Sequence, residues 1–408
     1  MPAQTRQERD SGFPVTRMTN ALPPDTNTAS LKRTWWTDGV TWAGLVPAYV
    51  IKRMASAVAL PLLICACQSS SAPNPSAHTS AGVTPSSVAG SWQTPSAREV
   101  TLGAVGDLAV NPQAVYALYT PAGTQGKLAG AINTMLARID RASGIVHKAG
   151  PFPGALRIAV GGGSVWVGGS NQYPASPYPG AIGVVRLDPD SLKQLVSVAL
   201  PGERDQRPLV AAVAASPGQV WLAYGRHLYQ LDPKTGAVQS KQSLDGVAAS
   251  ITIDSKTSRL YVGSDAAANQ TQATITEWGT ATMRKLASDV TGGAGLGGPQ
   301  IAAAGNDVWV AFATGMLGQV EHRRASDLSV LPTASSRYTN SVRVYIAGGF
   351  VWTTDGMANQ LACLDPVIGA IRASTSLNLG GVVAGDTAGL YVGNVRGVDG
   401  LVPDPRCR

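Results

Sequence analysis

The chain has 408 residues and a formal net charge of +7, but only 14% of its residues are charged. That fraction is well below the ~25% typical of globular proteins. Residues 1–66 hold seven Lys/Arg and four Asp/Glu, so the remainder carries only +4. No cluster of Lys and Arg is interleaved with aromatic residues, and the composition therefore argues against a nucleic-acid partner.

The first 49 residues look unlike the rest of the chain. They combine Pro, Thr and scattered charges without a sustained hydrophobic period, and their three tryptophans belong to no repeat. We interpret residues 1–49 as a non-native upstream extension, or as disordered, with translation beginning near Val50 or Met54. A peptide from this segment in the cell's proteome would contradict the interpretation of a misplaced start.

Residues 50–66 have the features of an export signal. Lys52 and Arg53 form a basic start, and residues 54–64 are an apolar run of signal-peptide length. The run is too short to span a bilayer, which needs about 20 apolar residues. The alternative is a buried strand or core helix, but a Ser/Pro-rich stretch follows directly and favours the signal peptide.

The signal ends in the sequence ICAC at residues 64–67. It resembles a bacterial lipobox, in which Cys67 is lipidated and becomes the mature N-terminus, although Cys65 replaces the usual Ala, Ser or Thr. Residues 67–96 are rich in Ser, Pro and Ala, as expected of a flexible tether. We therefore predict an extracytoplasmic protein that is held at the membrane by lipid on Cys67.

A repeat dominates the remainder, residues 97–408. Seven times a turn leads into an aliphatic residue followed by an aromatic one, at intervals of 39 to 55 residues. The seven pairs are Val115-Tyr116, Val165-Trp166, Val220-Trp221, Leu260-Tyr261, Val308-Trp309, Val351-Trp352 and Leu390-Tyr391. This spacing is the length of one four-stranded propeller blade. Because the aromatic residue recurs at one position, it indicates packing between blades rather than a ligand-binding box.

Each repeat has the same internal order. A strand of small residues precedes the aromatic pair, as an innermost strand near the propeller axis requires. A third strand ends in Asp-Pro in the phrases LDPD, LDPK and LDPV, and a fourth strand follows the turn. The sequence therefore predicts an all-β, seven-bladed β-propeller of four-stranded blades.

The seventh repeat lacks a strand. After Leu390-Tyr391 only a third strand remains, whereas residues 97–102, AREVTL, form an unpaired strand at the other end. Pairing the two would close the ring and leave no open sheet edge. We therefore expect the N-terminal strand to complete the last blade.

Two cysteines remain after the signal is removed and Cys67 is lipidated. The predicted ring closure places Cys407 beside Cys363 in the matching third strand, and in an oxidising compartment the two could form a disulfide. Free thiols in the cytosol are the alternative, and metal binding by two cysteines without a nearby His is less favoured.

The V-W and LDP-x-T-G phrases over residues 97–408 resemble the bacterial seven-bladed propellers of the YVTN and streptogramin-lyase-like group. The resemblance implies a fold more than a function. The group includes a magnesium-dependent lyase that uses His and Glu in the central region, and also binding or sensor modules of cell envelopes. Here the histidines of the repeat region are His147, His227 and His322, and none has a Glu at a matching inner position in a neighbouring repeat. No catalytic residue, metal ligand or cofactor is therefore predicted.

Unequal loops identify the face on which a ligand would bind. Residues 120–134, 169–181 and 264–272 are long connections between second and third strands, and residues 202–208 and 292–299 open on the same face. They predict a polar rim around one mouth of the axial channel, unless they are solvated loops without a role. The predicted ligand-binding residues are Asn171, Gln172, Tyr173, Tyr178, Glu203, Arg204, Asp205 and Arg207.

Few ionisable residues are expected near the axial channel, which favours a binding module over an enzyme. The predicted function is a monomeric, lipid-anchored, non-catalytic propeller that binds a protein, peptide or glycan at the cell envelope. The alternative is a metal-dependent lyase or lactonase-like envelope enzyme with its site in the axial channel. Two acidic or His side chains that face the axis would favour this alternative.

Overall fold

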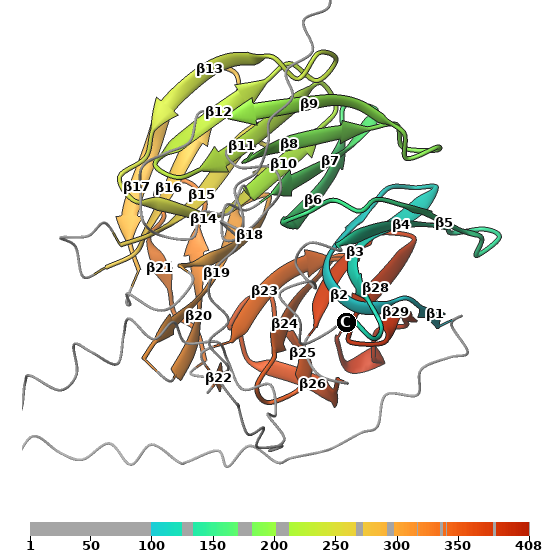
Figure 1. Ribbon diagram of the computed structural model, residues 1–408. Coiled ribbons are helices and arrows are strands. Elements are labelled where there is room, and N and C mark those ends of the chain that lie inside the picture. The colour runs from blue at the N-terminus through green and yellow to red at the C-terminus, as the bar shows by residue number, and fades with distance from the viewer. Residues whose placement is uncertain are drawn as a thin grey trace, which may run out of the picture. The chain divides into compact units, whose positions relative to one another are not determined.

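The computed structural model describes residues 99–124, 134–169, 182–200, 212–266, 272–291, 298–315, 317–334, 338–339, 341–377 and 381–407. Within these ranges the chain is all-β apart from one 3-10 helix at Pro405–Cys407, and no helix there is long and apolar enough to span a membrane. Antiparallel strands form seven sheets that follow one another around a ring (Figure 1). The predicted seven-bladed propeller is confirmed.

Each blade supplies one strand to the inside of the ring. These innermost strands are β2 (Gly103–Val110), β6 (Ala155–Gly161), β10 (Ala212–Ser216), β14 (Val247–Asp254), β18 (Gln300–Ala304), β23 (Val342–Ala347) and β27 (Val382–Asp386). Each contacts the innermost strand of the next blade, and β27 contacts β2. Small residues permit this approach: a Cβ added at Gly161 would lie 2.6 Å from the backbone of Ala215.

The second strands carry the aromatic residues of the repeat. They are β3 (Ala114–Pro121), β7 (Ser164–Gly169), β11 (Gln219–Tyr224), β15 (Arg259–Asp265), β19 (Asp307–Thr314), β24 (Phe350–Asp355) and β28 (Gly389–Gly393). Trp166, Trp221, Trp309 and Trp352 have no exposed surface. Trp166, for example, packs with Val213 and Leu222 of the next blade, which confirms the predicted role between blades.

The third strands are β4 (Met135–Asp140), β8 (Ile182–Leu187), β12 (His227–Leu231), β16 (Thr274–Gly279), β20 (Leu317–Arg324), β25 (Gln360–Leu364) and β29 (Gly397–Leu401). The outer strands of the first six blades are β5 (Val146–Ala149), β9 (Gln194–Leu200), β13 (Val238–Ser243), β17 (Lys285–Val290), β21 (Val330–Leu331) and β26 (Ile371–Ser376). In the fifth blade β22 (Tyr338–Thr339) also pairs with β20.

An aspartate organises the turn between third and outer strands. Asp232 Oδ1 accepts hydrogen bonds from the backbone N–H groups of Lys234 (2.8 Å) and Thr235 (2.7 Å). The N–H of Gly236 then donates to the Asp232 carbonyl, with φ of +72° at Gly236, a conformation that disfavours other residues. Asp140 and Asp365 form the same turn, which explains the Asp-x-x-x-Gly spacing in the sequence.

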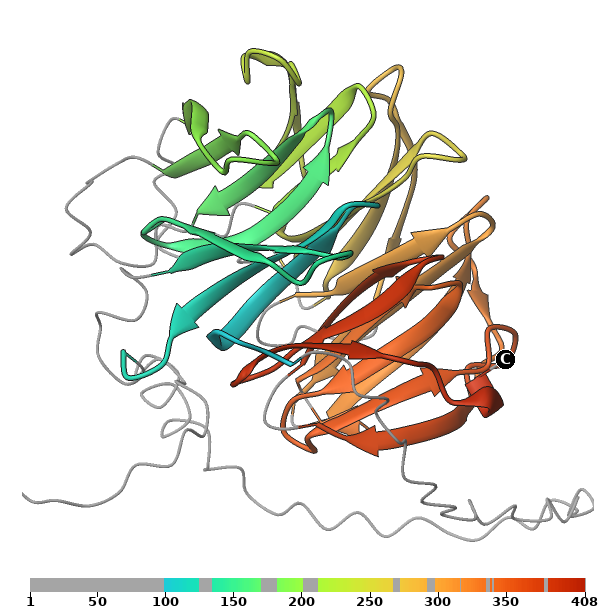
Figure 2. The ribbon, with the colours of Figure 1, turned by 90° about the vertical axis from the view of Figure 1, so that its right-hand side faces the viewer.

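The chain closes its own ring. Strand β1 (Val100–Thr101) is the outer strand of the seventh blade and pairs with β29 through Val100↔Val398 and Thr101↔Gly397. Figure 2 shows the first blade, in cyan, beside the last, in red. Cys363 and Cys407 form a disulfide across the sixth and seventh blades, with their Cα atoms 5.8 Å apart. Both the closure and the disulfide are as predicted.

Candidate functional site

The eight predicted ligand-binding residues, four from Asn171 to Tyr178 and four from Glu203 to Arg207, lie outside the described residues. Most of the long connections also lie outside them. Their attachment points are described. Since neighbouring strands are antiparallel, the second strands end where the innermost strands begin, and the long connections leave from this one end of the ring. We call this end the loop mouth.

Charged side chains lie on three innermost strands at one level close to the loop mouth. Asp107 of β2 pairs with Leu118. Arg157 of β6 pairs with Gly168, which is adjacent to the last residue of its strand. Arg343 of β23 pairs with Thr354, also adjacent to a strand end. Because the pairing register is shared, the three side chains occupy equivalent positions in the first, second and sixth blades.

The other blades place smaller or uncharged residues at this level. The equivalent residues, by the same register, are Ala212, Ser250, Gln300 and Val382. Two residues further along the innermost strand, most blades have alanine opposite the aromatic residue of the repeat. The sixth blade has Tyr345 there, opposite Trp352. Tyr345 is on the same face of β23 as Arg343, since the two are separated by one residue. We call Asp107, Arg157, Arg343 and Tyr345 the axial cluster.

The axial cluster is enclosed by the ring but is still reached by solvent. All four side chains are half-buried, neither exposed nor sealed in the core. They are also within electrostatic range of one another across blades: Asp107 interacts with Arg157 and Arg343, and the two arginines repel each other. The innermost strands therefore carry two cations and one carboxylate at a single level of the ring.

Asp107 is held by the backbone. Its Oδ2 accepts the N–H of Ile158 in the second blade at 3.0 Å, and its Oδ1 accepts the N–H of Leu108 at 3.1 Å. Burial nevertheless raises the pKa of Asp107, while Arg157 and these hydrogen bonds pull that pKa back down. Asp107 thus ties two innermost strands together and is a fixed acceptor.

The guanidinium groups of Arg157 and Arg343 have fewer hydrogen-bond partners than the Asp107 carboxylate. Arg157 Nη1 donates to the Leu156 carbonyl at 3.0 Å, and Arg343 lies beside the Tyr345 phenol, which raises the pKa of Arg343. Burial lowers the pKa of Arg157, and Asp107 opposes that shift. Within the described ranges no carboxylate lies at ion-pair distance from either guanidinium. Two guanidinium groups with unused donors are suited to binding an anion.

The axial cluster corrects one expectation. The sequence led us to expect few ionisable residues near the channel, yet three charged residues lie at one level of the innermost strands. The signal was present in the sequence: Asp107, Arg157 and Arg343 each stand nine positions before the aromatic residue of their repeat, Tyr116, Trp166 and Trp352. Aligning the repeats on the aromatic residue would have found the cluster.

His322 and Glu277 have structural settings. His322 stacks on Trp309 with ring centroids 4.2 Å apart, and its Nε2 lies 2.7 Å from Asp307 Oδ1. Glu277 is fully buried against Arg259. In the described part of the chain, no group of three or more His, Cys, Asp or Glu side chains is placed to hold a metal ion.

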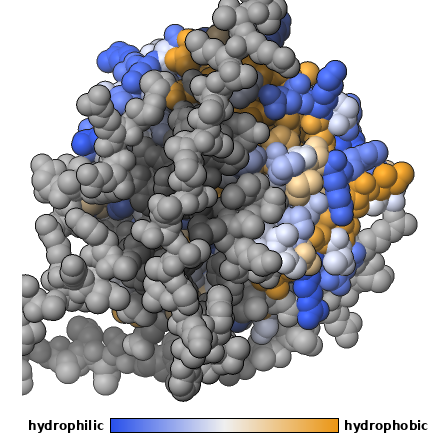
Figure 3. Space-filling view, viewed as in Figure 1, coloured by the Kyte–Doolittle hydropathy of each residue, from blue (hydrophilic) through white to orange (hydrophobic). Residues whose placement is uncertain are grey.

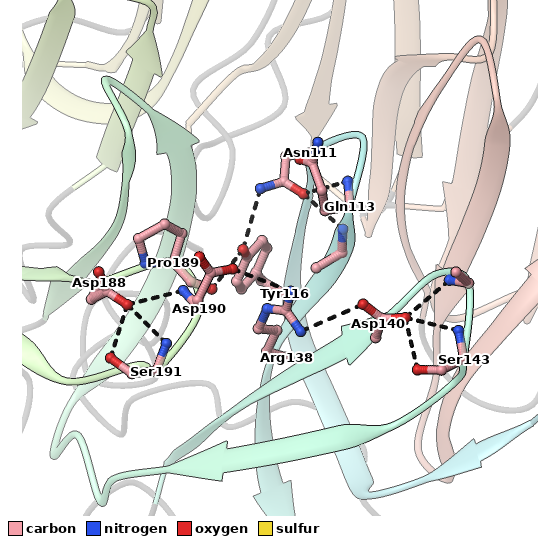
Figure 4. A network of polar contacts seen from close by, with 12 residues as sticks. Asn111, Gln113, Tyr116, Arg138, Asp140, Ser143, Asp188, Pro189, Asp190 and Ser191 are labelled. Carbon is pink, nitrogen blue, oxygen red and sulfur yellow. Dashed lines mark hydrogen bonds and ion pairs between the residues drawn. The ribbon is translucent and has the colours of Figure 1, made fainter.

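A second set of polar contacts lies at the opposite end of the blades and joins neighbours. Figure 4 shows Tyr116, whose hydroxyl donates to the Pro189 carbonyl at 2.9 Å, and Arg138, whose Nη2 lies 3.3 Å from Asp190 Oδ1. Arg138 faces Tyr116 across the strand pair. At the corresponding position, Arg186 and His322 contact the backbone carbonyls of Lys234 and Val367 in the next blade's turn. In the sixth blade Cys363 occupies this position and forms the disulfide with Cys407. This recurrence identifies an inter-blade connection rather than a ligand site.

A cavity of about 280 Å³ lies at the seam between the first and seventh blades. Arg141, Tyr391 and Gly400 are among its lining residues. Gly400 faces Tyr391 where the corresponding third-strand position holds Arg138 or His322 in other blades, so the seam is less well filled. The described surface visible in Figure 3 mixes hydrophilic and hydrophobic residues. Of these features, the axial cluster is the candidate site, because it combines charge, partial exposure and unused donors.

Comparisons with known proteins support the fold. No protein-family model matches the chain, and no curated protein matches it. Hydrazine synthase of Kuenenia stuttgartiensis matches over 75% of this chain and 97% of its own, with 10% identity and a TM-score of 0.55. A chain of the mitotic checkpoint complex matches over 85% of this chain and 99% of its own, with 11% identity and a TM-score of 0.56.

BamB of Moraxella catarrhalis is also similar, over 74% of this chain and 85% of its own, with 14% identity and a TM-score of 0.45. That weaker similarity adds nothing to the fold assignment. At these identities the likeness is one of fold alone, and propellers serve many unrelated functions. The chain is a seven-bladed β-propeller whose function must be argued from its own residues.

Proposed function

We propose that this protein is a lipid-anchored, extracytoplasmic β-propeller that binds a protein, peptide or glycan ligand at the loop mouth without catalysing a reaction. The observation that carries the proposal is the axial cluster. Its charged side chains lie at the end of the ring from which the predicted long loops leave. Fixed charges inside a ring of variable loops are a common arrangement for recognition.

The export half of the proposal rests on the sequence at residues 50–67, with Cys67 as the lipidated residue. The disulfide between Cys363 and Cys407 supports it, since such bonds persist in oxidising compartments. The anchor is tested by Cys67→Ser, which should move the protein from the membrane fraction to the soluble extracytoplasmic fraction. Unchanged membrane association of this variant would contradict lipid anchoring.

A cross-linked pull-down from the protein's own envelope tests the binding half. The intact protein is compared with a variant in which residues 120–134 and 169–181 are shortened. The matched control is Arg324→Gln, an exposed residue at the opposite end of the fifth blade. We expect a partner that the intact protein and the control recover and the shortened variant loses. Equal recovery by all three would place binding elsewhere and contradict the proposal.

The enzyme alternative, a metal-dependent lyase or lactonase, has no residue set to support it among the described residues. The axial cluster supplies one acidic side chain, Asp107, and both of its oxygens accept backbone hydrogen bonds. The two arginines favour an anion over a cation at this level of the ring. Binding is therefore the function that we propose.

A further inference from the structure

We propose that the axial cluster is a binding site for a carboxylate group, held by Arg157 and Arg343 at the loop mouth. This inference deepens the proposed function, on which it rests, by naming the chemical group that the mouth recognises. Three observations carry it: the placement of the two arginines, their unused donors, and the charge of the cluster.

The first observation is the placement of the two arginines. Arg157 and Arg343 occupy one level of the ring but belong to the second and sixth blades, between which only the seventh and first intervene. Burial lowers the pKa of Arg157, and the charge of Arg343 lowers that pKa further. Two like charges inside a protein raise each other's energy, and an anion between them would remove that cost.

Donors come second. A guanidinium group has five N–H donors in a planar fork, which matches the two oxygens of a carboxylate. Of these, Arg157 uses Nη1 for the Leu156 carbonyl. Neither arginine has an ion-pair partner in the described ranges. Half-buried guanidinium donors without an ionic partner are therefore available to a ligand that enters from solvent.

The charge of the cluster selects the ligand. Arg157 and Arg343 carry two positive charges, and Asp107, whose two oxygens both act as acceptors, carries one negative charge. A single negative charge therefore brings the enclosed cluster to neutrality. A carboxylate provides that charge, whereas a phosphate, with up to two charges near neutral pH, would overshoot it.

Tyr345 limits the depth of the site. Its ring stands where most blades have alanine, and its hydroxyl donates to the Gly381 carbonyl of the seventh blade at 3.3 Å. The phenol is therefore fixed beside Arg343 one step further from the loop mouth. A ligand that enters from the mouth would meet the guanidinium groups before the ring of Tyr345, so the carboxylate should be a terminal group of the ligand.

Isothermal titration calorimetry on the full-length protein tests the proposal with four probes. They are N-acetylglycine, its neutral amide, N-acetyl-dialanine with a free C-terminus, and inorganic phosphate. We expect the two carboxylates to bind, the amide to bind at least about tenfold more weakly, and phosphate to compete poorly. Tighter binding of the dialanine would identify a peptide end as the source, and equal binding a small acid; both support a carboxylate site.

Arg157→Gln and Arg343→Gln should each weaken carboxylate binding by about tenfold or more, whereas Arg324→Gln should leave it unchanged. Far-ultraviolet circular dichroism and thermal unfolding check that each variant is folded. If a Gln variant fails to fold, Arg157→Lys and Arg343→Lys replace it, because lysine keeps the charge and loses the fork. Carboxylate affinity that is unchanged in the folded arginine variants would overturn the proposal.

Equal binding of the acid and the amide, or preferential binding of phosphate, would also overturn it. The failure of this inference is distinguishable from the failure of the proposed function. If the loop-dependent partner is recovered in the pull-down but no carboxylate binds, the binding module stands and the carboxylate site falls. If carboxylates bind and no loop-dependent partner is found, the site stands and the macromolecular ligand falls.

Discussion

Arg141 forms a bidentate ion pair with Asp386 across the seam where the ring closes. Its Nη1 lies 2.6 Å from Asp386 Oδ2 and its Nη2 lies 2.9 Å from Oδ1, while its Nε donates to the Tyr391 hydroxyl at 3.0 Å. Arg141 follows β4 of the first blade and Asp386 ends β27 of the seventh. The first and last blades of the propeller are therefore joined by a bidentate ion pair in addition to strand β1.

Substituting Asp386→Asn should destabilise the fold, because Arg141 is largely buried and would lose its charged partner. We expect a loss of about 1–3 kcal/mol in the free energy of unfolding, measured by urea denaturation. Asp327→Asn is the control, since its ion pair with Arg324 is exposed on both sides; it should cost well under 1 kcal/mol. Equal losses would mean that the seam pair is no stronger than a surface pair.

The same pair predicts a pH dependence. Its hydrogen bonds from Arg141 are the main reason that the pKa of Asp386 lies below its ordinary value. A carboxyl group with a lowered folded-state pKa stabilises the fold above its unfolded-state pKa, about 3.9, and loses that contribution as the pH falls. The stability difference between wild type and Asp386→Asn should therefore be full at pH 6 and shrink below about pH 4. A difference that persists undiminished into acid would contradict this.

The disulfide should matter for stability as well as for closure. It encloses a sequence separation of 44 residues and joins the sixth blade to the end of the seventh. Cys363→Ala with Cys407→Ala should lower the free energy of unfolding by ~2–4 kcal/mol, because the unfolded chain regains the freedom of that loop. Denaturation of the wild type with and without reductant checks the effect; coincident curves would argue against it.

Close approach of the innermost strands makes Gly161 sensitive to substitution. A Cβ there would come within 2.6 Å of backbone atoms of Ala215 and Ser216, so one strand must shift. Gly161→Ala should cost ~1–3 kcal/mol by overpacking. Gly106→Ala on β2 is the matched control, since its Cβ would meet nothing closer than 4.0 Å. Thermal unfolding of the two variants should separate them, and equal midpoints would show that the strands adjust freely.

The buried Glu277 and the partly exposed Arg259 form an ion pair in the fourth blade, and their substitutions should be coupled. Glu277 has no exposed surface, and burial raises the pKa of Glu277 while Arg259 lowers it. Arg259→Leu alone should destabilise the fold by ~3–5 kcal/mol, because it leaves the carboxyl group buried without its cation. Adding Glu277→Leu should recover much of that loss. A double variant as unstable as the sum of the single ones would show no coupling.

Much of the fold could be predicted because each repeat marks its own strands locally. The aromatic residue of the second strand, such as Trp221, and the Asp-Pro turn that begins at Asp232 lie within about a dozen residues of each other. Counting strands then exposed the deficit in the last blade and the spare strand at the N-terminus. From that closure the meeting of Cys363 and Cys407 followed.

The axial cluster was missed because its members are far apart in the sequence and none belongs to a motif, although its three charged residues share one spacing to the aromatic residue of their repeat. Asp107 and Arg343 are brought together only by the curvature of the ring. Bulges between Val105 and Asp107 and between Ala155 and Arg157 lie before the two charged residues, so they leave the spacing to the aromatic residue unchanged. The loop residues predicted to bind ligand lie outside the described residues and stay predictions.

Site-specific photo-cross-linking in cells that produce the protein tests the central claim most directly. A photoreactive residue at Thr124, on the loop-mouth side of the first blade, is compared with one at Ala142, in the turn at the opposite end of the same blade. We predict that Thr124 cross-links to a ligand or partner and that Ala142 does not. Cross-linking from Ala142 alone would place recognition on the opposite face and contradict a binding function at the loop mouth.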